Sequence, residues 1–345
     1  FVKGQGAFGA LGAFLYWCTT SPLKLAQMMR MGWRMGKAGN PVYGLAYALE
    51  AAMVARWMQQ RELRYLHVHF GNAGATVGVL VKQLKGCHLS YTIHGPDEFD
   101  DVPGQHLAFK MQMADQVVCI SQFAKGQLMR ISRPDDWPKF QVCRLGVDPS
   151  QFTFTTRKAA NATVELLCVG RLSPAKGQVL LVQACAQLRD KGLNFSLTLV
   201  GDGPDRRRIE QAIASLQLGS HITLNGSLNQ EAVKAKFARA DVFVLPSLAE
   251  GIPVVLMEAM SSGVPCVSTP VNGIPELIEH DCTGLLATPG DVDSLTRQLT
   301  RLIQQPQLRQ SLAHAAHGKV LADFDLIRNV ARLSQCFAHA QGVAV

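Results

Sequence analysis

Two glutamates eight positions apart carry the clearest chemical signal in the sequence. They end the run Glu250-Gly-Ile-Pro-Val-Val-Leu-Met-Glu258. Eight positions is a little over two helical turns, so a helix that starts near Pro253 places both carboxylates near one face. Carboxylates accept hydrogen bonds from hydroxyls, and sugars are rich in hydroxyls. For an isolated pair, an ordinary helix with a capping acid and one buried Glu is the better explanation, and only the neighbouring motifs favour a site.

The residues between the two glutamates predict an anion site. Gly251 lets the backbone approach a ligand closely, and Pro253 suits a first helical position, where its missing N–H costs nothing. The free N–H groups around Ile252 then face an anion at the positive end of the helix. Hydroxyl acceptors that flank a helix-end anion site suit a sugar phosphate.

Strand and helix patterns alternate along two parts of the chain, which predicts an α/β protein with two parallel sheets. Ligands are expected at the carboxyl ends of the strands. The predicted strands are 66–70, 89–93, 117–120 and 140–145 in the first part, and 165–170, 195–201, 221–226, 241–246 and 265–269 in the second.

These patterns divide the chain into a first domain (1–150), a second domain (160–325) and a C-terminal helix (326–345) that is expected to pack back toward the first domain. A polar linker is predicted at 146–162. The first domain offers only four strands, so we expect it to lack an opening strand and loop. Since the chain begins with Phe rather than Met, it is expected to be a fragment.

Cations and glycines follow two of the predicted strands of the second domain. Arg171 and Lys176 come after the strand 165–170. An Arg fork and a Lys point charge at a strand end can clamp a diphosphate, although two solvated loop cations are the commoner case. The run Gly201-Asp-Gly203-Pro204 is a weaker signal, because a plain turn explains it equally well. No G-x-G-x-x-G opens the chain, so a nicotinamide cofactor is not supported.

The histidine, aspartate and cysteine patterns are weaker evidence for a functional site. His94 follows a strand and precedes Gly95, where an imidazole can meet a sugar hydroxyl, but a lone His at a strand end is more often structural. His67 and His69 are interpreted as strand residues, and the acids Asp291 and Asp293 as helix-capping residues. His and Cys never cluster at ligand spacing, so no metal is expected. Nine cysteines without a C-x-x-C pair favour reduced thiols.

Charge is concentrated at the beginning of the chain. The net charge is +8, and residues 1–70 hold eight basic and two acidic side chains, which leaves +6 there. Anionic lipid, a pyrophosphate-bearing substrate and a merely solvated surface all fit, whereas no nucleic-acid motif accompanies the charge. An apolar run at 5–18 precedes Lys24, Arg30, Arg34 and Lys37, which predicts peripheral membrane contact through 5–37. A buried helix with a basic outer face is an equal alternative.

Residues 66–330 resemble family 4 of the retaining, nucleotide-sugar-dependent glycosyltransferases, which have the GT-B fold of two doubly wound Rossmann-like domains facing across a cleft. The resemblance is closest to bacterial exopolysaccharide enzymes of the colanic-acid type. It rests on VGRLSPAKG (169–177), LVGDGP (199–204), LPSLAEGIPVVLMEAMSSGVPCVST (245–269) and GIPELIEHDCTGLL (273–286), supported by HVHFGNAG (67–74), TIHGPDEFD (92–100) and RLGVDPSQF (144–152).

The resemblance implies roles by position. Arg171 and Lys176 match the diphosphate-binding pair, Glu250 the acid that holds the donor sugar, and Glu258 the acid that grips the ribose. His94 matches a histidine of the first domain that contacts the sugar. The resemblance further implies that the donor lies against Gly170, Gly201, Gly203, Pro204, Asn225, Leu228, Gly251, Ile252 and Pro253.

The implied function is transfer of a hexose from a nucleoside-diphosphate sugar, most simply UDP-hexose, to an oligosaccharide on a polyprenyl diphosphate. The reaction is expected to retain the anomeric configuration and to need neither metal nor cofactor. The expected location is the cytoplasm, on the inner face of the membrane. An inactive or truncated nucleotide-sugar-binding module is the alternative, and a phosphorylase, expected to need pyridoxal phosphate, or an epimerase on the same fold is a third.

Overall fold

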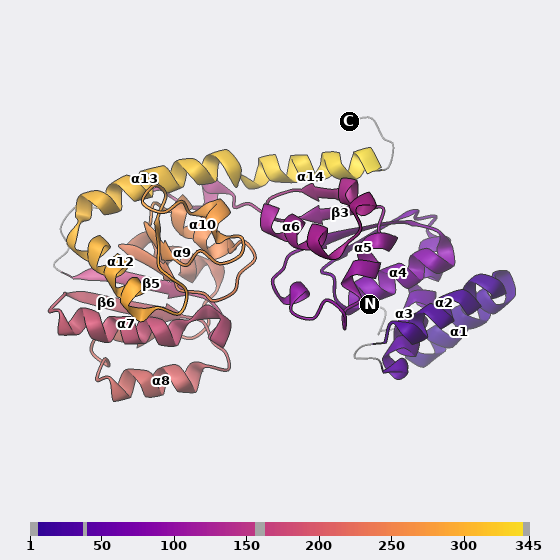
Figure 1. Ribbon diagram of the computed structural model, residues 1–345, viewed down its shortest axis with the longest axis horizontal. Helices are drawn as coiled ribbons and strands as arrows, with labels where there is room; N and C mark the ends of the chain where they lie inside the picture. The colour runs from indigo at the N-terminus through magenta and orange to yellow at the C-terminus, as the bar shows by residue number, and fades with distance from the viewer. Residues whose placement is uncertain (1–5, 37–39, 156–162, 341–345) are drawn as a thin grey trace. The chain divides into compact units, whose positions relative to one another are not determined.

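The computed structural model describes residues 6–36, 40–155 and 163–340, which divide into two compact units (Figure 1). Unit 1 comprises residues 1–143 and 334–345, and unit 2 comprises residues 144–333. Part of the predicted linker, 156–162, and the predicted membrane-contact residues 5 and Lys37 lie outside the described residues. Each unit contains one parallel sheet, as the alternating patterns predict.

Three helices precede the first strand of unit 1: α1 (Gly6–Thr20), α2 (Pro22–Arg34) and α3 (Pro41–Gln60). The apolar run at 5–18 predicts only the first of them. The start of α3 has a local cause that the sequence shows, because the Asn40 side chain accepts the Val42 N–H at 3.0 Å and Pro41 follows it. All three helices pack with α4 (Ala73–Lys85) through a buried cluster that includes Trp17, Met28 and Leu80.

The sheet of unit 1 has the order β1-β2-β3-β4, with every pair parallel. A second buried cluster joins the sheet to α4 through Ala75 and Val79. The helix α4 is therefore buried between the sheet and the three N-terminal helices. The four strands confirm the prediction for this part of the chain. The elements are β1 (Tyr65–His69), β2 (His88–Ile93), α5 (Leu107–Met113), β3 (Gln116–Cys119), α6 (Gln122–Ile131) and β4 (Phe140–Val142).

Unit 2 contains a six-stranded parallel sheet with the order β10-β9-β8-β5-β6-β7. The five predicted strands are present, and β10 (Leu285–Leu286) is an addition that is too short to show a pattern. The other elements are β5 (Val164–Val169), α7 (Gln178–Asp190), β6 (Phe195–Val200), α8 (Arg206–Ser215), β7 (Ile222–Leu224), α9 (Gln230–Arg239), β8 (Val242–Leu245), α10 (Val254–Ser261), β9 (Cys266–Ser268), α11 (Ile274–Leu277), α12 (Val292–Gln304) and α13 (Pro306–Asp323). The last helix, α14 (Leu326–Ala340), begins in unit 2, and its residues from Ser334 onward belong to unit 1.

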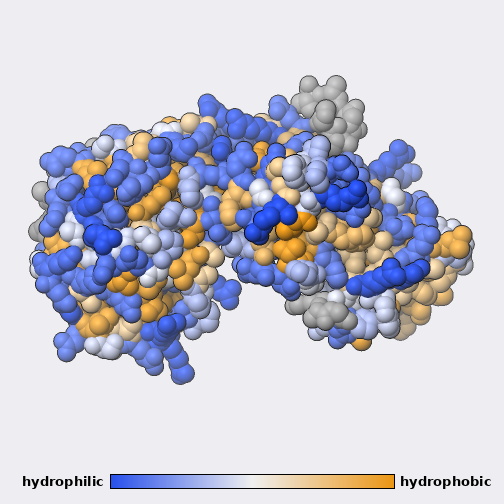
Figure 2. Space-filling model, in the orientation of Figure 1, coloured by the Kyte–Doolittle hydropathy of each residue, from blue (hydrophilic) through white to orange (hydrophobic). Residues whose placement is uncertain are grey.

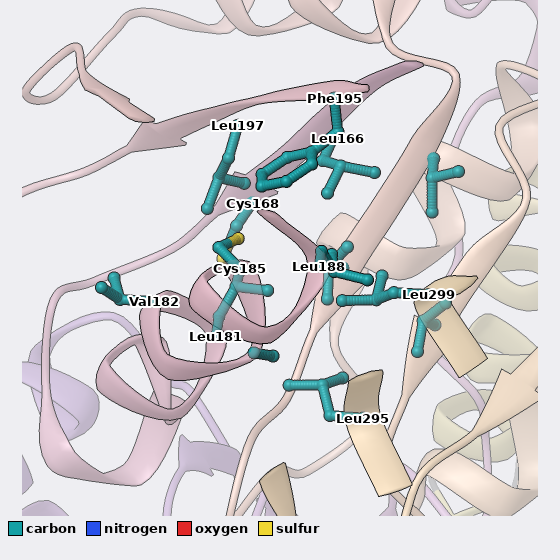
Figure 3. Packing of buried hydrophobic residues seen from close by; sticks show 14 of the residues in the cluster. Leu166, Cys168, Leu181, Val182, Cys185, Leu188, Phe195, Leu197, Leu295 and Leu299 are labelled. Carbon is teal, nitrogen blue, oxygen red and sulfur yellow. The ribbon is translucent and has the colours of Figure 1, made fainter. Parts of the chain in front are cut away.

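Successive residues of β5 enter opposite cores of unit 2, as the two-residue period of a strand requires. Leu166 and Cys168 belong to the core that α7 covers, and Figure 3 shows Cys168 beside Cys185 and Leu166 beside Phe195. Leu167 belongs to the other core, which α9, α10 and α13 cover. Both faces of the sheet are therefore buried, and only its strand ends are left to build a site.

The strand order of unit 2 reverses beside β5. From β5 the chain adds β6 and then β7 on one side, whereas β8, β9 and β10 follow on the other. The loops after β5 and β8 leave the sheet in opposite directions at such a point, which opens a crevice at the carboxyl ends of the two strands. Arg171 and Lys176 follow β5, and Glu250 follows β8.

Candidate active site

The loop after β5 is pressed against the end of β8. Gly177 has a φ of +68°, and a Cβ there would lie 2.2 Å from the carbonyl oxygen of Pro246, so only glycine fits. Lys176 directly precedes this contact at the end of a short 3₁₀ turn, Pro174–Lys176. Arg171 lies earlier in the loop, is exposed, and forms no ion pair with any other described residue. The tight packing therefore brings Lys176 to the loop that carries Glu250.

Lys176 and Glu250 form an ion pair with 2.6 Å between Nζ and Oε1. The same carboxylate oxygen accepts the Ser247 hydroxyl at 2.7 Å, and Glu250 is only 5% exposed. Among the residues that the structure describes, none of the hydrogen bonds to Glu250 involves Oε2. The carboxylate is thus fixed through one oxygen, and the other is left to accept a ligand hydroxyl.

The N-terminus of α10 lies between the two glutamates, as the sequence predicts, but the helix begins one residue later. Pro253 is its N-cap, because a ψ of 117° makes that residue extended, and no side chain caps the helix. Ile252 is 3% exposed and belongs to the core, so its backbone alone is available to a ligand. Gly273 packs closely against this loop, because a Cβ added to it would lie 2.4 Å from the carbonyl oxygen of Gly251.

Glu258 lies in the second turn of α10 and differs from Glu250 in its surroundings. Burial raises its pKa, and the positive charge of Lys234 partly opposes that rise. The ammonium of Lys234 donates to Glu231 at 3.0 Å and to Gln151 at 3.1 Å. Glu258 is therefore a half-buried acid with a cation nearby and no direct ion pair among the described residues.

The loop after β6 lies against the loop after β5. A Cβ on Gly201 would lie 1.9 Å from the carbonyl oxygen of Gly170, and one on Gly203 would lie 2.3 Å from that of Leu172. The N–H of Gly201 donates to Gly226, next to Asn225, at 2.8 Å. The structure thus brings these predicted residues together at adjacent strand ends. Pro204 continues the turn toward α8, and Leu228 packs against the core to which the buried residues of α10 belong.

In unit 1, His94 lies at the end of β2 within a group of rings. Its Nε2 is 3.2 Å from Nδ1 of His69, and its ring centroid is 4.4 Å from that of Phe70. Burial, reinforced by the neighbouring His69, lowers the pKa of His94 to about 4. His67 is held inside the strand pair by Ser90 at 2.6 Å and Thr92 at 2.9 Å, which fits its interpretation as a strand residue.

A buried acid and a buried base hold the loops around these rings. The Glu98 carboxylate accepts backbone N–H groups from Gly71, Gly95 and His94, the last at 2.6 Å. The Lys110 ammonium donates to the carbonyl oxygens of Gly71 and Asn72, both at 2.8 Å. Burial raises the pKa of Glu98 and lowers that of Lys110 to about 7.

Residues 154–319 match the model of a known family, the group 1 glycosyl transferases. Two curated relatives extend the match into unit 1. The amylovoran biosynthesis glycosyltransferase AmsK of Erwinia amylovora is 34% identical over 274 residues, 75% of this chain and 66% of AmsK. The putative colanic acid biosynthesis glycosyltransferase WcaL of Salmonella typhimurium is 35% identical over 270 residues, 74% of this chain and 66% of WcaL.

The chain contains a group 1 glycosyltransferase domain. It spans just under two thirds of the length of AmsK and of WcaL. Anabaena HepE, solved in complex with UDP and glucose, has a TM-score of 0.74 and 22% identity, covering 84% of this chain and 81% of HepE. That likeness shows the fold, which is GT-B, in agreement with the prediction.

The sequence analysis did not identify four polar or aromatic residues that the structure places at or around these groups. Ser247 lies in the LPSLAEG run directly after β8, and that position at a strand end is the signal by which it could have been found. Phe70, Glu98 and Lys110 gave no such signal, because their importance comes from contacts between loops that are distant in sequence. The interpretation of Asp291 as a helix cap is confirmed, since its side chain accepts the Ser294 N–H at 2.9 Å.

The described part of the chain contains no group of three or more His, Cys, Asp or Glu side chains that could hold a metal ion. None of its described helices is long and apolar enough to cross a membrane. All nine cysteines are free.

Proposed function

We propose that this glycosyltransferase moves a hexose from UDP-hexose to a growing oligosaccharide in exopolysaccharide biosynthesis. The observation that carries the proposal is the pair of Lys176 and Glu250 at the β5/β8 reversal, with the unpaired Arg171 in the same loop. A sugar diphosphate needs hydroxyl acceptors beside cations, which is what these three side chains offer. The UDP and glucose in HepE and the pathway named for AmsK support the choice of donor and pathway.

Each group then has a task in binding the donor. Glu250 accepts a sugar hydroxyl through Oε2, while Lys176 and Arg171 neutralise the diphosphate. The uncapped N-terminus of α10 adds N–H groups beside the distal phosphate. Glu258 accepts the ribose hydroxyls, and the glycine-lined loop after β6 receives the base together with Asn225 and Leu228. His94, which lies in unit 1, is proposed to contact a sugar.

We further propose that transfer retains the anomeric configuration and needs no metal or cofactor. The bond from C1 to the phosphate oxygen breaks as the bond from C1 to the acceptor oxygen forms on the same face, and the acceptor's proton passes to the leaving phosphate. Arg171 and Lys176 stabilise the charge that builds on that phosphate. Proton NMR of the product checks the configuration, and full activity in EDTA is expected; inversion or loss of activity in EDTA would contradict these points.

The acceptor is proposed to be linked to polyprenyl diphosphate, with the enzyme on the inner face of the cytoplasmic membrane. Phe8, Leu11 and Leu15 form one exposed face of α1 and are 90%, 55% and 56% exposed. Figure 2 shows hydrophobic side chains reaching the surface where Figure 1 places α1 to α3. Lys24 and Arg30 are exposed on α2 and suit anionic headgroups. Flotation with anionic vesicles should be lost in Phe8→Ser with Leu15→Ser, and unchanged flotation would sink the idea.

The decisive test of the proposed function is Glu250→Gln. The amide keeps the shape but removes the charge that holds Lys176 and half of the acceptor capacity, so transfer should fall about 100-fold or more. UDP release in the presence of acceptor measures it, and Glu279→Gln, an exposed acid of the same unit, is the matched control. Near-normal turnover by Glu250→Gln would rule out the assigned role. UDP-hexose binding by the wild type with no transfer would favour a binding module instead.

A further inference from the structure

Phe70 has a backbone conformation that residues other than glycine rarely adopt. Its φ is +68°, in the left-handed region, where a bulky residue is strained. The residue still ends the ladder between β1 and β2, because its N–H donates to the Thr92 carbonyl oxygen at 2.8 Å. Strain of this kind persists only where surrounding contacts enforce it, and it concentrates at functional sites.

The contacts that enforce the strain lie directly after Phe70. The N–H of Gly71 donates to the buried Glu98 carboxylate, and the Gly71 and Asn72 carbonyl oxygens accept from Lys110. Lys110 is 1% exposed and Glu98 is 4% exposed, so neither side chain faces solvent and both bind backbone groups. The chain therefore leaves β1 along one path, and that path turns the Phe70 side chain outward.

The Phe70 ring is partly exposed and lies beside histidine rings. Phe70 is 45% exposed, with its ring centroid 4.4 Å from that of His94, and His94 contacts the exposed His69. With its pKa lowered to about 4, the His94 imidazole carries no charge at neutral pH. The Phe70 ring leans on the His94 ring at an interplanar angle of 31°, and His69 lies beside His94 at 36°, so the three rings place an apolar face next to hydrogen-bonding ring nitrogens.

We propose that Phe70, His69 and His94 form a stacking platform for a pyranose ring of the acceptor glycan. A pyranose presents an apolar C–H face, which suits the Phe70 ring, and hydroxyls at its edge, which suit the imidazoles. The uncharged His94 imidazole offers no positive charge to a phosphate, and the exposed Phe70 ring suits a C–H face, so the platform fits an uncharged sugar better than the diphosphate of the donor. The assignment to the acceptor rests on the proposed function, whereas the sugar platform itself does not.

The test exploits the opposite effects of strain and function at one position. Phe70→Gly removes the aromatic ring and relieves the left-handed backbone, so it should keep or raise Tm while weakening sugar binding at least fivefold. Phe70→Trp keeps a stacking surface and should bind within about twofold of the wild type. Glu62→Gly is the matched control, because Glu62 is an exposed residue of unit 1 with a φ of +55° and no part in the platform.

Binding is measured by saturation-transfer NMR on the full chain with methyl α- and β-glucopyranoside, galactopyranoside and mannopyranoside. Saturation of the aromatic protons should appear on sugar C–H protons in the wild type and Glu62→Gly, and be lost in Phe70→Gly. Equal transfer in Phe70→Gly, or no transfer from any of the six sugars to the wild type, overturns the platform. UDP binding, measured by calorimetry, should be the same in all variants. A wild type that fails to bind UDP would contradict the proposed function and leave the sugar result to stand on its own.

Discussion

The carboxyl ends of the two sheets use a lysine and a glutamate in opposite ways. In unit 2, Lys176 pairs directly with Glu250, and the Lys176 side chain is 26% exposed. In unit 1, Lys110 and Glu98 are both buried and bind backbone groups, while aromatic and imidazole rings take the exposed positions. One sheet end therefore has a partly exposed ion pair, and the other uses buried charges to hold the backbone beneath exposed rings.

The difference shows that residue type alone does not give the role of a lysine–glutamate combination. A partly exposed ammonium that bonds one carboxylate oxygen can be shared with a phosphate at modest cost. A buried ammonium that holds two carbonyl oxygens cannot leave without stranding both. The roles follow from exposure and from the remaining partners, and each can be tested by removing one charge.

Lys110→Met should give the largest effect on stability. The substitution keeps most of the volume but leaves the Gly71 and Asn72 carbonyl oxygens without a donor, so we expect a loss of about 3 kcal/mol in the free energy of unfolding. Urea unfolding followed by circular dichroism measures it. Lys24→Met, at an exposed position of the same unit, is the control and should cost less than about 0.5 kcal/mol.

The pH dependence of Lys110→Met gives a second check on the same residue. Unfolded lysine takes up its proton near 10.5, but folded Lys110 does so only near 7. Between these values the unfolded chain binds more protons, so the contribution of Lys110 to stability rises with pH. The wild type should show this rise between pH 7 and pH 10, and Lys110→Met should lack it; identical slopes would mean that Lys110 is not a buried charge.

Arg171→Met tests whether the exposed charges of unit 2 are reserved for the donor. Arg171 has no ion pair among the described residues, so its loss should leave the urea midpoint unchanged. The affinity for UDP should fall about tenfold to hundredfold, because a charge-assisted hydrogen bond contributes roughly 1.5–3 kcal/mol. Calorimetry at two salt concentrations measures both the affinity and its salt dependence.

The control for Arg171→Met is Arg207→Met, an exposed arginine on α8 of the same unit. It changes the net charge equally but removes no group of the proposed site, so UDP affinity should stay within about twofold. Equal weakening by both variants would indicate a general effect of charge and would remove the distinction between the two sheet ends.

The part of the site that the sequence predicts is the part with local causes. Apolar runs ended by Gly or Pro marked the strands of unit 2, so Arg171, Gly201 and Glu250 were all placed at strand ends correctly. The short 3₁₀ turn before Gly177 and the extended Pro253 shift boundaries by one residue at most. The direct contact of Lys176 with Glu250 was not predictable, because it depends on β8 lying beside β5.

Unit 1 shows where sequence reasoning ends. Lys110 and Glu98 look like ordinary surface charges in the sequence, and only the packing of α5 against the loops after β1 and β2 buries them. The strain at Phe70 is equally invisible, since Gly71 beside it is the residue that a sequence pattern selects for unusual backbone. The helix α3 was missed because its apolar residues lie all around the helix and show no clear period in the sequence.

Acid should weaken the difference between the two sheet ends, with the smallest of the expected effects. Burial, and then the neighbouring His69 and His94, lower the pKa of His67 to about 4, whereas an unfolded histidine titrates near 6.5. Between these values the unfolded chain binds more protons, so the contribution of His67 to stability is intact above pH 6.5 and is lost as pH falls toward 4.

In His67→Gln, a side-chain amide replaces the ring between Ser90 and Thr92 and does not titrate. At pH 7.5 the variant should unfold close to the wild type. Its Tm should then fall less steeply on acidification, by an amount equivalent to about 1 kcal/mol at pH 4.5 after allowance for solvent screening. Parallel Tm profiles from pH 7.5 to pH 4.5 would mean that His67 takes up its proton in the folded chain, and the surface of unit 1 would then be charged, like that of unit 2, under mildly acidic conditions.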